Sequence, residues 1–169
     1  PAAWHFHVTK HKHKLISVND FSQIQLPKRE TLLAPWLTEG SINMVFADRG
    51  IGKTFFCLSC AVALANGEGF LDYKAGKPVP VLYLDGEMQA TAMQERLRQL
   101  TNGKSTKEPL SIFTPDCQDL TDHIPDIGDP HGRLEIDELV KTVNPKVVFI
   151  DNISTFIRTG HENEGDSWS

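Results

Sequence analysis

The sequence predicts an α/β fold in which helices pack over a mainly parallel sheet, and three observations support this prediction. Short apolar runs rich in β-branched and aromatic residues recur along the chain. Longer segments with helical periodicity separate these runs, as parallel strands require, because their connections must cross back over the sheet. A turn with two glycines also joins the first run to the first long helix. Helices on both faces of such a sheet would give three layers.

The composition is that of a single globular domain. The chain has 169 residues, of which 40% are hydrophobic and 23% are charged. The three cysteines are an odd number, and we find neither a signal peptide nor an apolar run of about 18 residues, so we expect a cytoplasmic protein without a membrane span. A net charge of −5 argues against binding nucleic acid through bulk charge, but is compatible with a local basic loop or a basic channel in an oligomer.

Residues 1–30 are predicted to form an N-terminal arm or edge segment before a domain that spans residues 31–169. This segment is rich in imidazoles and ammonium groups, namely His5, His7, His11, His13, Lys10, Lys12 and Lys14. Metal binding is one interpretation of the histidines. A solvated arm is the favoured one, because no cysteine or acidic residue stands at ligand spacing.

The first strand and the first long helix are predicted from residues 41–66. Ile42–Phe46 is a run of strand formers, so we expect a buried strand there, with Trp36 packed in the core just before it. Lys53–Asn66 is a long run of small and apolar residues that predicts a buried helix, and Gly67 marks its end.

The turn between this strand and this helix has the sequence ADRGIGKT. A strand, a glycine turn, Lys-Thr and a helix are the context of a phosphate-binding P-loop. Gly50 and Gly52 would allow backbone N–H groups to approach phosphates in φ > 0 conformations where a Cβ would clash. Lys53 is predicted to reach the β- and γ-phosphates of ATP, and the Thr54 hydroxyl to bind Mg²⁺. The predicted ATP-binding residues are Ala47, Asp48, Arg49, Gly50, Ile51, Gly52, Lys53, Thr54 and Phe55.

Ala47 departs from the P-loop pattern, in which a glycine stands at this position. Alanine is the mildest replacement, so we expect the loop to close with a slightly different path into its first turn. Cys57 and Cys60 form a CxxC inside the helix, and we favour two small buried thiols there over a redox or metal site.

The remaining elements alternate between strands and helices. We predict a loop over 67–80, a strand over Val81–Asp85, a helix over 89–101, a strand over Leu110–Thr114, an acidic solvated loop over 115–132, a helix over 133–143 and a strand over Val147–Asp151. The apolar positions expected to face inward are Ala92, Met93, Leu97 and Leu100 in the first of these helices, and Leu134, Leu139 and Val143 in the second.

Asp151 ends the last predicted strand. A buried apolar strand that ends in an acid, behind a P-loop, has the form of a Walker B strand, so Asp151 is predicted to hold Mg²⁺ through water or together with Thr54. Asp85-Gly86-Glu87 follows another strand at the same edge, which is where ligands bind in open α/β sheets.

Three segments together resemble the RecA-like P-loop ATPase domains of the RepA replicative-helicase type, which occur in plasmids, phages and other mobile elements. They are WLTEGSINMVFADRGIGKT, VLYLDGEM and VVFIDNIST, and the resemblance runs from about Trp36 to the end of the chain. It implies ATP hydrolysis coupled to DNA replication, with single-stranded DNA as partner and a homo-oligomeric, hexameric ring.

The resemblance also implies catalytic roles. Glu87 matches the glutamate that activates the attacking water, and Asn152 follows Asp151, so no glutamate stands beside the Walker B acid to act as base. Lys53 is the other predicted catalytic residue. Asn152, Ser154 and Thr155 could sense the γ-phosphate or only cap a turn. Arg133 or Arg158 could complete a neighbouring site.

The resemblance further implies a strand between the Walker A and Walker B strands, which would follow Asp151 in sequence. We therefore expect the chain to be an incomplete RecA-like domain. Two alternatives stay open: a non-catalytic nucleotide-binding module, which Ala47 favours, and a small-molecule kinase. The kinase is less favoured because the arginines form no lid-like cluster; they are Arg29, Arg49, Arg96, Arg98, Arg133 and Arg158.

Overall fold

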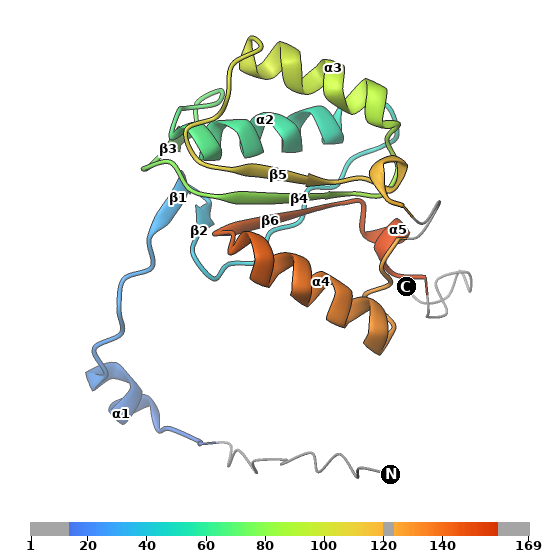
Figure 1. The fold of residues 1–169 in the computed structure, drawn as a ribbon. Coiled ribbons are helices and arrows are strands. Elements are labelled where there is room, and N and C mark those ends of the chain that lie inside the picture. Colours follow the sequence, from blue (N-terminus) through green and yellow to red (C-terminus); the bar gives the residue numbers. More distant parts are fainter. Residues whose placement is uncertain (1–13, 120–123, 159–169) are drawn as a thin grey trace, which may run out of the picture.

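The computed structural model describes residues 14–119 and 124–158, which form an α/β fold around a parallel sheet (Figure 1). In this sheet, β4 (Val81–Asp85) lies between β5 (Leu110–Phe113) and β6 (Val147–Asp151), and both pairings are parallel. The predicted fold class is confirmed. The bounds of β4 and β6 also match the predicted strands.

Alternate side chains of β4 enter two apolar clusters, one on each face of the sheet. Val81 and Tyr83 pack on one face with residues of α2 (Lys53–Asn66) and α3 (Ala90–Thr101). Leu82 and Leu84 pack on the other face with residues of α4 (Pro130–Val143). Figure 1 shows these helices on opposite sides of the sheet, so the predicted three layers are present.

The helix α2 begins and ends where the sequence predicts. Its residues from Leu58 to Ala65 are all buried, as expected for a helix that is apolar on every side. Gly67 follows in the left-handed conformation with φ +63°, and a Cβ there would lie 2.7 Å from Pro78. The predicted glycine stop signal is therefore confirmed.

The helix α4 differs from its prediction in two ways. It begins at Pro130 rather than near residue 133, because the Asp129 carboxylate accepts hydrogen bonds from the His131 and Gly132 N–H groups and Pro130 occupies the first turn. Leu134, predicted to face inward, is 59% exposed. Leu139 and Val143 do pack against the apolar cluster.

The strand β6 is less buried than predicted. Val148 and Ile150 are 40% and 37% exposed, whereas every residue of β4 is buried. Within the described residues β6 is hydrogen-bonded to one neighbouring strand only, which explains its exposed side chains.

The predicted strand over Ile42–Phe46 is wrong for this structure. The segment has no regular secondary structure, and Ile42 and Phe46 are 100% and 86% exposed. A single extended segment leaves its N–H and C=O groups without partners, and no described strand pairs with this one. Apolar composition alone does not place the run in the sheet.

A second, antiparallel sheet was not predicted. It consists of β2 (Leu37–Thr38), β1 (Thr31–Ala34) and β3 (Lys74–Ala75) in that order, and β3 lies within the segment predicted to be a loop. Trp36 packs edge-to-face on Tyr73 with ring centroids 5.8 Å apart, beside the apolar cluster as expected.

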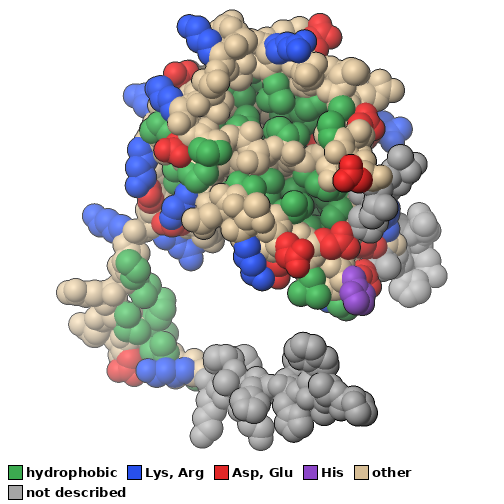
Figure 2. Space-filling model, in the orientation of Figure 1, with side chains coloured by type: hydrophobic (Ala, Val, Ile, Leu, Met, Phe, Trp, Pro, Cys, Tyr) green, Lys and Arg blue, Asp and Glu red, His purple; other side chains and the backbone are tan. Residues whose placement is uncertain are grey.

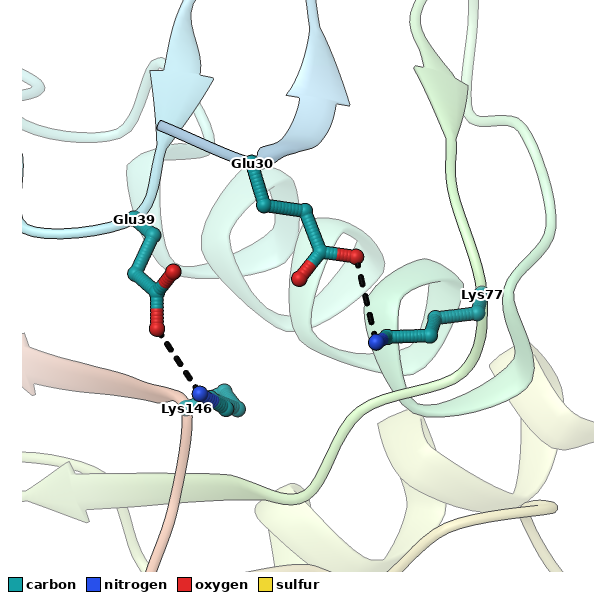
Figure 3. Close-up of polar contacts among 4 residues, drawn as sticks. All are labelled: Glu30, Glu39, Lys77 and Lys146. Carbon is teal, nitrogen blue, oxygen red and sulfur yellow. Dashed lines mark hydrogen bonds and ion pairs between the residues drawn. The ribbon is translucent and has the colours of Figure 1, made fainter. Parts of the chain in front are cut away.

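Two ion pairs lie beside this sheet (Figure 3). Lys77 Nζ lies 3.3 Å from Glu30 Oε1, and Lys146 Nζ lies 2.7 Å from Glu39 Oε1. The second pair joins the segment after β2 to the residue just before β6. The Lys146 partner lowers the pKa of Glu39, and Glu39 in turn raises the pKa of Lys146.

The described part of the N-terminal segment contains α1 (Val18–Gln23), none of whose residues is buried. It extends away from the rest of the molecule, and apolar side chains gather on it (Figures 1 and 2). His5, His7, His11 and His13 lie outside the described residues. Two short helical turns complete the fold, η1 (Pro115–Cys117) and α5 (Ile153–Phe156). None of the described helices has the length and apolar character needed to cross a bilayer.

Candidate functional site

The glycine turn has the backbone conformation that the sequence predicts. Gly50 and Gly52 have φ of +80° and +98°, and Gly52 is the residue from which α2 begins. A Cβ at either position would meet no heavy atom within 4 Å. The need for glycine therefore comes from the left-handed backbone rather than from crowding by other protein atoms.

The Lys53 ammonium group lies on the turn itself. Its Nζ donates hydrogen bonds to the carbonyl oxygens of Ala47 at 2.6 Å and Asp48 at 2.9 Å. These bonds close the loop through its first two residues. They also fit the alanine at position 47, because Lys53 uses the backbone carbonyl there and not a side chain.

The beginning of α2 lies at the carboxyl edge of the sheet. The other end of the helix is held near the starts of β4 and β5: Val79 N donates to Leu64 O at 3.1 Å and Glu108 N donates to Ala65 O at 2.9 Å. Fourteen residues of helix span about 21 Å, enough to carry Lys53 to the opposite edge (Figure 1). No side chain caps this helix start, which leaves the positive end of its dipole directed at the turn.

Two carboxylates lie side by side where β4 and β6 end. Asp85 and Asp151 are register partners, and Gly86 N donates to Asp151 O at 2.9 Å. The Asp151 carboxylate accepts a hydrogen bond of 2.8 Å from the Tyr83 hydroxyl. Burial, followed by the negative charge of Asp151, raises the pKa of Tyr83 above its usual range, so this hydroxyl remains a donor.

The helix α2 packs against β6, and Cys57 and Phe149 contact the same apolar cluster. Burial raises the pKa of the Cys57 thiol to about 11, and the negative charge of Asp151 is the second cause. Thr54 precedes Cys57 by three residues and therefore lies on the same side of α2.

Asp85 organises the turn after β4, a role that the sequence analysis missed. The side chain is 1% exposed, and both carboxylate oxygens lie 3.2 Å from the Met88 N–H group, which donates to them. Burial raises the pKa of Asp85 to about 6, with smaller contributions from the charges of Asp151 and Glu87. An aspartate two residues before a glutamate, in Asp-Gly-Glu, is a signal for such a turn, since aspartates accept bonds from nearby backbone N–H groups.

Glu87 is held by Asn152 across the two strand ends. The Asn152 amide donates to the Glu87 carboxylate, and the Asn152 side-chain oxygen accepts from Ser154 and from Thr155 N. Asn152 is therefore the N-cap of α5, as one of its predicted alternatives proposed. It also links Glu87 to the end of β6, a contact between residues 65 positions apart in sequence.

Several other side chains contribute to structure. Asp116 accepts from Ala90 N at 2.8 Å at the start of α3, and Asp129 caps α4, so two aspartates of the predicted solvated loop are helix caps. Of the two thiols predicted to be buried in α2, Cys60 is buried and Cys57 is half-buried, and burial raises the pKa of Cys60 to about 12. Arg133 and Arg158 both donate to backbone carbonyls of residues 124–128.

The oxygen groups present suit Mg²⁺ better than a metal held by protein alone. No group of three or more His, Cys, Asp or Glu side chains is arranged to hold a metal within the described ranges. Mg²⁺ is normally bound by one or two protein oxygens together with substrate phosphates and water. The Thr54 hydroxyl and the Asp151 carboxylate are such oxygens.

Two grooves of the described surface lie away from these residues. One of about 520 Å³ runs between α3 and β5, and one of about 360 Å³ lies between Trp36, Phe56, Tyr73 and residues 43–46. Neither is lined by Lys53, Glu87 or Asp151.

Comparison with known proteins identifies the family of the chain. The chain matches the family model described as AAA domain (AAA_25) over residues 8–169, nearly its whole length. A search of curated proteins found no match. A parallel sheet, a glycine turn leading into a buried helix, and acids at adjacent strand ends agree with that family. The chain belongs to the AAA-domain family of nucleotide-binding ATPases.

Proposed function

We propose that this chain binds ATP with Mg²⁺ and hydrolyses it, and that hydrolysis drives movement on single-stranded DNA, as in RepA-type replicative helicases. The observation that carries the proposal is the pairing of the strand ends. Asp85 and Asp151 are in register, and Asn152 bonds to Glu87 beside them, at the edge where α2 begins.

The glycine turn and Lys53 would bind the phosphates. Backbone N–H groups at the start of α2 and the positive end of its dipole favour phosphate oxygens. Lys53 is already at the turn, bonded to two carbonyls. We propose that it exchanges these carbonyls for β- and γ-phosphate oxygens, with Ala47, Asp48, Arg49, Ile51 and Phe55 completing the loop.

Glu87 is the proposed general base. Its carboxylate is exposed at the strand end and can accept a proton from water, and the Asn152 amide fixes its orientation. The residue after Asp151 is Asn152, so no carboxylate stands beside Asp151 in sequence to act as the base. Asp85 is less suited because it is buried and bonded to Met88 N.

Thr54 and Asp151 would hold Mg²⁺. When bound, this ion neutralises charge on the phosphate oxygens during phosphoryl transfer. Thr54 lies in the first turn of α2, and Asp151 is the last residue of β6.

The DNA and assembly parts of the proposal come from the RepA-type resemblance. We propose a homo-oligomeric ring in which residues 31–169 form the ATPase domain, residues 1–30 form an arm, and an arginine such as Arg133 or Arg158 reaches a neighbouring site. Both arginines bond to backbone carbonyls in this chain and would have to release them.

The experiment that tests the proposal measures Mg²⁺-dependent ATP hydrolysis with and without single-stranded DNA. Glu87→Gln is expected to lower turnover by about 10²- to 10⁴-fold while ATP binding persists. Lys53→Ala is expected to lose binding. Glu138→Gln, an exposed glutamate on α4, is the matched control and should behave as wild type.

Turnover that is stimulated by DNA and lost in both site variants would support the motor. ATP binding without turnover in the wild type would refute hydrolysis and leave a non-catalytic nucleotide-binding module, which the bonds between Lys53 and the loop carbonyls also favour. Transfer of labelled phosphate to a small acceptor would instead indicate a kinase.

A further inference from the structure

Tyr83 is the largest of the fully buried side chains in the described residues, and it carries a hydroxyl group. It lies in the middle of β4, between the sheet and the apolar cluster that includes Leu58 and Met93. A phenylalanine would fill the same space without bringing a polar atom into the core. Packing alone therefore does not explain why a tyrosine with its polar hydroxyl occupies this position.

The geometry directs this hydroxyl to Asp151. Tyr83 is the register partner of Phe149, and its ring stacks on that of Phe149 with centroids 5.6 Å apart and planes 18° apart. Asp151 lies two residues further along β6, on the same side of the sheet. The Tyr83 hydroxyl reaches this diagonal neighbour and donates to Asp151 Oδ2 at 2.8 Å.

We propose that Tyr83 is a positioning residue for the Mg²⁺ site, whose hydroxyl holds one oxygen of the Asp151 carboxylate so that the other is presented in one orientation. The inference rests on the proposed function, in which Asp151 holds Mg²⁺.

Two features make Tyr83 suited to this role. Its ring is fixed by the Phe149 stack and by complete burial, so the hydroxyl has a defined position. The bond to Asp151 is also the one hydrogen bond that the structure shows for that carboxylate within the described residues. Without it, the carboxylate would be free to rotate about its terminal torsion, which has broad minima.

The chain provides a matched control, because it contains two tyrosines. Tyr73 packs against the same apolar cluster and stacks edge-to-face on Trp36 and Phe56. Its side-chain hydroxyl makes no hydrogen bond with any described residue. Tyr73→Phe and Tyr83→Phe therefore remove the same atom from two aromatic positions, and only one of them touches Asp151.

The experiment measures the Mg²⁺ concentration needed for half-maximal binding of fluorescent ADP, and does not depend on turnover. Loss of an outer partner of a metal ligand typically costs 10- to 100-fold in metal affinity. Tyr83→Phe is expected to raise the half-maximal Mg²⁺ concentration by about that factor. Tyr73→Phe should leave the curve at the wild-type position, and circular dichroism confirms folding of both variants.

A second pair of variants tests whether Tyr83 acts through Asp151. In the Asp151→Asn background, adding Tyr83→Phe should produce no further shift, because the carboxylate that the Tyr83 hydroxyl holds is already absent. A further shift there, or a Tyr83→Phe curve that overlays the wild type, would overturn the inference. Failure of the proposed function is seen separately, as wild-type nucleotide binding that does not depend on Mg²⁺.

Discussion

Two five-residue apolar runs of this chain differ in structure and in burial. The run Val81–Asp85 is the central strand β4, and all five of its residues are buried. The run Ile42–Phe46 has similar strand-forming residues, but it forms no strand, and Ile42 is fully exposed. The difference teaches that an apolar run enters a sheet only where neighbouring strands can pair with its backbone.

This difference also explains how the glycine turn is held. In the described structure the turn is not supported by a strand before it. It is fixed instead by the left-handed glycines, by the bonds of Lys53 to Ala47 and Asp48, and by the buried helix α2 that follows. The acids, in contrast, are held by β4 and β6. The two halves of the candidate site therefore differ in how firmly the fold positions them.

Hydrogen exchange should show the largest contrast between the two runs. Amides of β4 are paired on both sides and are expected to exchange only through global unfolding, whereas those of Ile42–Phe46 should exchange almost freely. For a domain of ordinary stability this means a difference of at least about 10³-fold in protection. Exchange measured by NMR or mass spectrometry tests it, and equal protection of the two runs would show that Ile42–Phe46 is paired in solution.

Truncation of one side chain in each run should give the next largest contrast. Leu84→Ala removes a fully buried side chain and is expected to lower the free energy of unfolding by about 2–5 kcal/mol. Met44 is 69% exposed, so Met44→Ala should change it by less than about 0.5 kcal/mol. Urea denaturation compares the two variants directly. Similar losses would mean that Met44 is buried in solution.

The sequence predicted the elements that have local signals and missed those that depend on pairing between distant strands. The bounds of β4, β6 and α2 could be predicted because apolar runs and a terminal glycine are local signals. The sheet of β1, β2 and β3 could not, since β2 and β3 have two residues each and strands this short show no periodicity. Residue Asp129 did provide a local signal for the earlier start of α4, as a capping residue before Pro130, but the acidic loop composition obscured it.

The candidate site was predictable in its parts rather than in its contacts. Position after a strand or in a glycine turn identified Glu87, Asp151 and Lys53 as candidates, and their chemical roles stay predictions. The bonds between Asn152 and Glu87, and between Tyr83 and Asp151, join residues 65 and 68 positions apart. No local pattern reports such pairs, because they depend on the register between β4 and β6.

The buried carboxyl group of Asp85, at the end of β4, should make the free energy of unfolding depend on pH. Folding raises the pKa of Asp85 from 3.8 to about 6, so the folded state holds a proton that the unfolded state has lost in this range. Stability from this group is fully present below pH 3.8 and is lost as the pH rises to about 6. The loss amounts to up to about 3 kcal/mol.

Asp85→Asn tests this dependence because asparagine does not titrate and can still accept a bond from Met88 N. The free energy of unfolding of the wild type should fall relative to that of the variant between pH 4 and pH 6, as measured by urea denaturation at each pH. Asp137→Asn, an exposed change on α4, should show no such window. A constant difference between wild type and Asp85→Asn would mean that the carboxylate is solvated in solution.

The smallest effect is expected at the ion pair that joins the two regions. Glu39 precedes the exposed run and Lys146 precedes β6, and both side chains are about half exposed, so water screens their attraction. Folding lowers the pKa of Glu39 from 4.5, so the contribution of Glu39 to stability is present above pH 4.5 and is lost as the pH falls further. Folding raises the pKa of Lys146 from 10.5, so the contribution of Lys146 to stability is present below pH 10.5 and is lost as the pH rises further. Glu39→Gln should therefore cause a small, salt-sensitive loss of stability between these limits, and β4 exchange, which reports global unfolding, should quicken by a correspondingly small factor. A loss of stability that is as large at high salt as at low salt would contradict a screened ion pair between the two regions.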